Sequence, residues 1–202
     1  MVIYVLVLFL KINPYLFPYR NGRQFGAMVI IVFVTAVFIP IVSILMMRGT
    51  GLIDSLQMKE KTQRIGPLIV TAIAYLWLFL NIRTHDEIPK VFSAFILGAI
   101  ISLFIAFFIN NFSKISLHAV GLGGMLIAIV NVMMLSERAY AVFDFGNVIS
   151  ISMHNLFLLA LLIIIIGAVL SSRLYLKAHQ LKDVLGGFLV GMLGQLIAIN
   201  LF

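Results

Sequence analysis

The chain has 202 residues, of which 63% are hydrophobic and 10% charged, and its formal net charge is +7. Soluble domains carry about a quarter charged residues, so this composition excludes a soluble fold and predicts several membrane spans. The absence of cysteine excludes disulfides, thiol catalysis and cysteine-ligated metals. The basic balance favours anionic headgroups or a phosphate-bearing ligand over nucleic acid, because no soluble basic module is present.

Apolar runs of about 17–25 residues are typical of membrane-spanning helices. A weak first run, 1–17, contains Lys11 and Pro14 and lacks the features of a cleavable signal peptide. The stronger predicted spans are 24–47, 66–83, 89–112, 117–136, 151–171 and 181–201. We expect Pro40 to kink or loosen the first of these. The predicted fold is all-α, a polytopic bundle of about six to seven spans in a single domain over 1–202.

Alternating spans bring three of the polar connections to the same side of the membrane. These connections are 58–67, 111–121 and 171–183, whereas 83–90 and 136–150 lie on the opposite side. The shared side therefore receives two histidines, an aspartate and several lysines and arginines.

His179 and Asp183 are four residues apart, so on a helix they share one face. A carboxylate that accepts a hydrogen bond from one imidazole nitrogen leaves the other nitrogen free to act as a nucleophile. The alternative is an ordinary solvated pair at a helix start, which is common and contributes little to stability.

The remaining polar residues of this side suit a phosphate ligand. The guanidinium of Arg173 offers a planar fork for phosphate oxygens, although a basic residue that ends a span also anchors it at the interface. His118 begins a helix, where backbone N–H groups favour anions, and Ser116 adds a hydroxyl. Lys59 and Arg64 add positive charge, or serve as interfacial anchors. Together these residues favour phosphoryl transfer, in which cations bind the phosphate, one histidine attacks and the other protonates the leaving group.

The segment "SRLYLKAHQLKD" fits the pattern S-R-x5-H-x3-D at Ser172, Arg173, His179 and Asp183. On this motif the chain resembles the type 2 phosphatidic acid phosphatase (PAP2) superfamily of membrane lipid phosphatases, which is related in fold to the vanadium haloperoxidases.

The two other motifs of that superfamily are kept in part. "ISLH" retains Ser116 and His118 of P-S-G-H, with Ile115 and Leu117 in place of proline and glycine. In the first motif, K-x6-R-P, the lysine and proline correspond to Lys59 and Pro67. Gly66 replaces the arginine of this motif, and Arg64 or Lys61 lies a short distance upstream.

The resemblance implies a metal-independent mechanism without a cofactor. His179 would be the nucleophile that forms a phosphohistidine, Asp183 would orient it, and His118 would protonate the leaving oxygen and later activate water. The residues implied to hold the phosphate are Arg173, Lys59, Arg64 and Ser116.

The expected substrate is a phosphomonoester or pyrophosphate of a lipid, with phosphatidic acid, phosphatidylglycerol phosphate and polyprenyl pyrophosphate as candidates. One alternative is a catalytically degenerate relative that binds or transports a lipid phosphate, which the changes at Gly66, Ile115 and Leu117 motivate. A second is a zinc site of two histidines and an aspartate, which the surrounding cations disfavour. The expected location is the lipid bilayer of a bacterial inner membrane, with the side of the site and the oligomeric state left open.

Three other features have structural interpretations. His85, beside Asp86 and Glu87, is expected in a solvated turn on the opposite side. His154 is expected to be satisfied locally. The spacing of Gly187, Gly191 and Gly194, together with the glycine-rich 120–124, predicts close helix packing.

Overall fold

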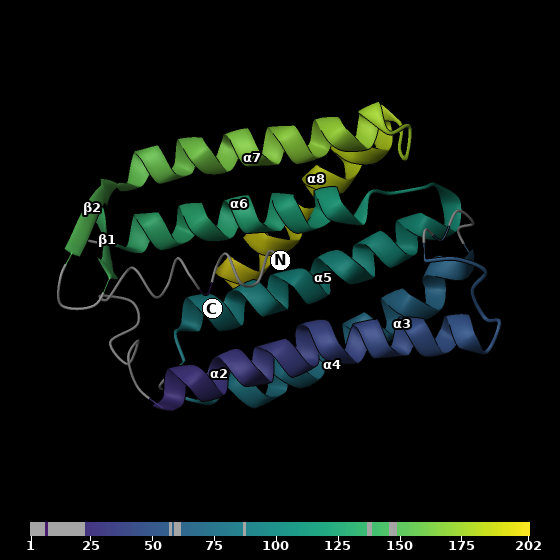
Figure 1. Ribbon diagram of the computed structural model, residues 1–202, viewed down its shortest axis with the longest axis horizontal. Coiled ribbons are helices and arrows are strands. Elements are labelled where there is room, and N and C mark those ends of the chain that lie inside the picture. The colour runs from purple at the N-terminus through teal and green to yellow at the C-terminus, as the bar shows by residue number, and fades with distance from the viewer. Residues whose placement is uncertain are drawn as a thin grey trace.

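The computed structural model describes residues 7, 23–56, 58, 62–86, 88–136, 139–145 and 149–202. Within these residues it is mostly helical, with six helices long and apolar enough to cross a membrane. The predicted weak span at 1–17 lies outside the described residues, apart from Val7. Figure 1 shows the elements in order, which are α2 (Arg23–Phe33), η1 (Val34–Phe38), α3 (Ile39–Gly49), η2 (Thr62–Arg64), α4 (Ile65–Ile82), α5 (Lys90–Phe112), α6 (Leu117–Leu135), β1 (Tyr140–Phe145), β2 (Ile149–His154), α7 (Asn155–Tyr175) and α8 (Leu181–Asn200).

The six predicted strong spans are confirmed, but the start of the fifth was wrong. Residues 151–154 belong to β2, which pairs antiparallel with β1, and the helix α7 runs from Asn155 to Tyr175. Alternating isoleucine and serine in "ISISMH" favours a strand over a helix. His154 pairs with Tyr140 across the ladder and then caps α7, because its Nδ1 accepts a hydrogen bond from the N–H of Leu156 at 3.1 Å. The prediction that His154 is satisfied locally is confirmed.

Pro40 loosens its span through a π-helix, η1, that interrupts α2 and α3. The N–H of Ile39 donates to the carbonyl of Val34, five residues earlier. Proline cannot donate a hydrogen bond, and its ring clashes with the carbonyl four residues before it, here that of Ala36. A wider turn removes that clash, so the loosening expected from the sequence takes the form of η1.

The three connections predicted to share a side lie together at one end of the bundle. In Figure 1 the α3–α4, α5–α6 and α7–α8 connections are at the right-hand end, and the hairpin is at the left. Two hydrogen bonds join the connections: the N–H of Ser116 donates to the carbonyl of Asp183 at 3.1 Å, and Arg64 Nη1 donates to the carbonyl of Ile115 at 3.3 Å.

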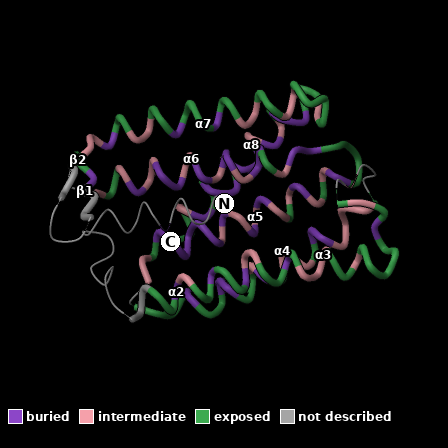
Figure 2. The backbone as a smooth tube through the Cα atoms, viewed as in Figure 1, coloured by how far each residue is buried: buried purple, intermediate pink, exposed green. Residues whose placement is uncertain are grey.

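Helices α6 and α8 approach each other through their glycines, as the sequence predicts. A Cβ at Gly191 would overlap the carbonyl oxygen of Val120, and one at Gly187 would lie 2.6 Å from the carbonyl oxygen of Ser116. Gly123 lies equally close to the backbone of Phe188. Figure 2 shows buried residues along α5 and α6 and mostly exposed ones along α7, which suits a lipid-facing helix. The contact between α6 and α8 fixes the start of α6 against the start of α8.

Candidate active site

His179 and Asp183 meet at the turn into α8, but not as two residues of one helix. His179 precedes Gln180, the N-cap of α8, and Asp183 is the third residue of the helix. His179 Nδ1 lies 3.6 Å from Asp183 Oδ2, just beyond hydrogen-bond distance. The same carboxylate oxygen accepts a hydrogen bond from the N–H of Gln180 at 3.1 Å, in a capping box. Asp183 therefore ends the turn and also faces the imidazole.

The end of α7 determines where this turn begins. The N–H of Ala178 donates to the carbonyl of Arg173, and the N–H of Lys177 donates to that of Leu174, which together form a Schellman motif. Lys177 holds the left-handed position of the motif, with φ of 51°, where glycine is usual. The motif links the backbone of Arg173 to the start of the segment that carries His179.

Replacing Lys177 with glycine is expected to stabilise the protein by about 1 kcal/mol, because a side chain in the left-handed region is strained. Thermal unfolding of the purified protein in detergent measures this, with Lys177→Ala as the matched control that removes the same side chain but keeps the Cβ. Equal unfolding temperatures for the two variants would contradict the prediction.

Ser116 and His118 lie at the start of α6. Ser116 is the N-cap, it is fully buried, and its Oγ has no hydrogen-bond partner. His118 follows in the first turn, is exposed, and lies close enough to Arg173 and His179 for their charges to interact. The positive end of the helix dipole and the free hydroxyl thus lie beside the second histidine, an arrangement that favours an anion.

Arg64 ends η2 and reaches the same cluster. Its Nε donates to the carbonyl of Met58 at 3.0 Å, and its Nη1 donates to Ile115. These bonds hold its charge close enough to Asp183 and His179 to interact with both. Arg173 is partly exposed, and its buried Nε has no hydrogen-bond partner. Of the other predicted cations, Lys59 and Lys61 lie outside the described residues.

Gly66, which replaces the arginine of the first motif, leaves little space for a side chain at its position. A Cβ there would lie 3.1 Å from the sulfur of Met47, so the flexible end of that side chain would have to shift slightly. Arg64 is two residues earlier and directs its guanidinium to Ile115, which is next to Ser116 in the chain. The structure therefore brings Arg64 to the cluster, whereas Lys61, the other alternative to the motif arginine, lies outside the described residues.

The surroundings of His179 favour its neutral form. Burial lowers the pKa of His179 below its ordinary value of 6.5, Arg64 lowers it further, Asp183 opposes this, and Lys114 lowers it again. A neutral imidazole at pH 7 has the lone pair that a nucleophile needs. Lys114 was not predicted as a site residue. Its position in the 111–121 connection, which shares a side with His179, could have indicated it.

One other histidine considered in the sequence does not join this cluster. His85 is exposed in the α4–α5 turn at the opposite end, as predicted. Among the described residues, no three histidine, aspartate or glutamate side chains gather closely enough to hold a metal ion. No protein-family model, curated protein or solved structure matches the chain.

Proposed function

We propose that the protein is an integral membrane phosphatase of the PAP2 type, which removes phosphate from a lipid phosphomonoester or pyrophosphate. The observation that carries the proposal is the convergence of His179, Asp183, His118 and two arginines at one end of a membrane-spanning bundle. A helix-start pair alone needs no second histidine and no arginine from another connection. Charge, nucleophile and proton donor are together what phosphoryl transfer requires.

In the proposed reaction, His179 attacks the phosphorus through Nε2, because Nδ1 faces Asp183. The bond between phosphorus and the leaving oxygen breaks, and His118 gives a proton to that oxygen. A phosphohistidine remains. Water then attacks its phosphorus, His118 takes the proton from the water, and the phosphorus–nitrogen bond breaks to release phosphate and free His179. Arg64, Arg173 and the start of α6 bind the charged oxygens throughout.

The proposal is tested by phosphate release from the purified protein in detergent. The substrates are phosphatidic acid, phosphatidylglycerol phosphate and a polyprenyl pyrophosphate, each with and without EDTA. We expect release from at least one lipid, unaffected by EDTA. Folded protein that binds these lipids but releases nothing would support the degenerate binding or transport relative instead. Release that EDTA abolishes would support a metal mechanism.

The pH profile tests the role of the cations near His179. Because the nucleophile is the neutral form, activity is lost as pH falls through its pKa, and a lowered pKa places this acid limb of kcat/KM below pH 6.5. Arg64→Gln removes a charge that lowers the pKa, so the limb should move to higher pH. Lys114→Gln is the matched control, and we expect a smaller shift in the same direction. An unmoved limb in Arg64→Gln would show that another group titrates.

A further inference from the structure

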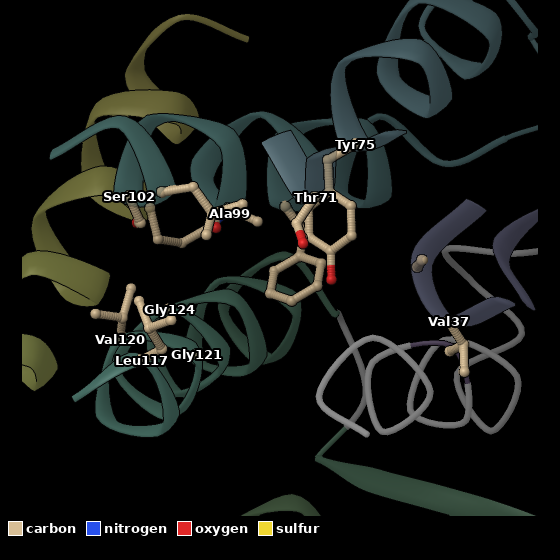
Figure 3. A pocket seen from close by; sticks show the side chains of 13 residues that line it. Val37, Thr71, Tyr75, Ala99, Ser102, Leu117, Val120, Gly121 and Gly124 are labelled. Atoms are coloured by element: carbon tan, nitrogen blue, oxygen red, sulfur yellow. The ribbon is translucent and has the colours of Figure 1, made fainter. Parts of the chain in front are cut away.

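A cavity of about 210 Å³ lies inside the bundle, between η1, α4, α5, α6 and α8. Its walls are mostly apolar. Figure 3 shows Tyr75 of α4, Ala99 and Ser102 of α5, and Leu117 of α6 around it. All of these residues belong to segments long and apolar enough to span the membrane. The cavity is therefore surrounded by parts of the protein that lie in the hydrocarbon region.

The cavity lies between a residue next to the candidate active site and a residue well inside α8. Its lining includes Leu117, the residue before His118, in the first turn of α6. It also includes Gln195, which follows Asp183 by twelve residues on α8, or about 18 Å at 1.5 Å per residue. Half of a hydrocarbon core about 30 Å thick is comparable to this length. A chain attached to a phosphate at His179 thus has a path of suitable direction and polarity.

Gln195 is an unusual residue for such a lining. It is 1% exposed, and its Oε1 has no hydrogen-bond partner. The amide lies against the backbone of Gly98, where a Cβ would overlap Oε1. A polar side chain buried at this depth without a partner is costly, and such residues mark functional sites in membrane proteins. Water can satisfy the amide in a cavity of this size, whereas methylene groups cannot.

Building on the proposed phosphatase, we propose that this cavity holds one hydrocarbon chain of the lipid substrate and that Gln195 limits its length. A chain that stops short of Gln195 gains apolar contacts and leaves the amide hydrated. A longer chain displaces that water and leaves the amide unpaired against methylene groups, which weakens binding by about ten-fold. Gln195 is thus a specificity-determining residue distant from the phosphate.

The test measures binding in detergent micelles with His179→Ala protein, so that no turnover is needed. The ligands are saturated phosphatidic acids of increasing chain length, from dioctanoyl to distearoyl. We expect affinity to rise with chain length and then to fall by about ten-fold. Gln195→Leu should remove the fall, and Asn200→Leu, the same amide-to-leucine change at an exposed site of α8, should keep it. Ala99→Leu, which narrows the cavity, should move the fall to shorter chains.

Phosphatidylcholines of the same chain lengths show whether the cavity takes the chain of a phosphomonoester lipid or that of any bilayer lipid. Weak binding without the fall supports a chain anchored by its phosphomonoester, whereas an identical fall would show a site for any bilayer lipid and overturn the proposal. Absence of the fall in the parent protein, or its persistence in Gln195→Leu, also overturns it. Because binding is measured without turnover, these outcomes can be interpreted even if the phosphatase assay fails.

Discussion

Replacing His179 with alanine is expected to lower the rate of phosphate release by a thousand-fold or more, to the background rate. The reason is that the variant lacks the nitrogen that bonds to phosphorus, so the two-step route through a phosphohistidine is closed. Arg64, Arg173 and the start of α6 remain, and they still bind the phosphate. Lipid binding should therefore persist while turnover is lost, which separates the loss of a nucleophile from the loss of a binding group.

The comparison uses initial rates with the preferred lipid and His85→Ala as the matched control. His85 is exposed at the opposite end of the bundle, so its loss should leave the rate unchanged. A labelled phosphoenzyme, stable in alkali and labile in acid, should form in the parent protein and be absent in His179→Ala. If the His179→Ala variant released phosphate at the rate of the parent protein, His179 would not be the nucleophile.

The proposed role of His118 as proton donor can be distinguished from that of His179 as nucleophile by a change of leaving group. His118→Ala removes the proton donor but keeps the nucleophile, and general acid–base groups contribute about 10²–10⁴-fold. A substrate whose leaving group needs no proton should therefore recover much of the lost rate of phosphoenzyme formation in His118→Ala. The same substrate should give no recovery in His179→Ala.

The spans could be predicted from the sequence because the hydrocarbon region of a bilayer permits few backbone conformations. Each helix must satisfy its own hydrogen bonds, so hydropathy alone located the six runs to within a few residues, apart from the start of α7. Counting spans was then enough to bring His118 and His179 to one end. The glycine spacing in α8 predicted its packing for a similar reason, since small residues are what a close helix contact in lipid requires.

Other features depend on contacts that the sequence does not display. Asp183 is half of a capping box because the turn places Gln180 at the N-cap of α8. The spacing between His179 and Asp183 does not reveal this role. Arg64 reaches the cluster through the carbonyl of Ile115, fifty-one residues away. Gln195 became notable only when the fold left its amide beside a cavity. The contacts of Arg64 and Gln195 result from tertiary packing, whereas the capping box is local and depends on the residue at which α8 begins.

Replacing Gly191 with alanine is expected to destabilise the bundle by about 3 kcal/mol, although alanine is the better helix former by about 1 kcal/mol. The added methyl group would overlap the carbonyl oxygen of Val120 and approach the backbone nitrogen of Gly124 at 2.8 Å. Both obstacles are backbone atoms of α6, which cannot move aside as a flexible side chain can. The helices must therefore separate, and with them the starts of α6 and α8 that carry His118 and Asp183.

Gly186, in the same helix, supplies the matched control, because a Cβ there would meet nothing within 4 Å. Gly186→Ala should therefore show only the helix-propensity gain, so the two alanine substitutions are expected to change stability in opposite directions. The fraction of protein that stays monodisperse after heating in detergent measures both. If Gly191→Ala were as stable as Gly186→Ala, α6 and α8 would not be in backbone contact at Gly191, and the geometry that joins Ser116 to Asp183 would have to be revised.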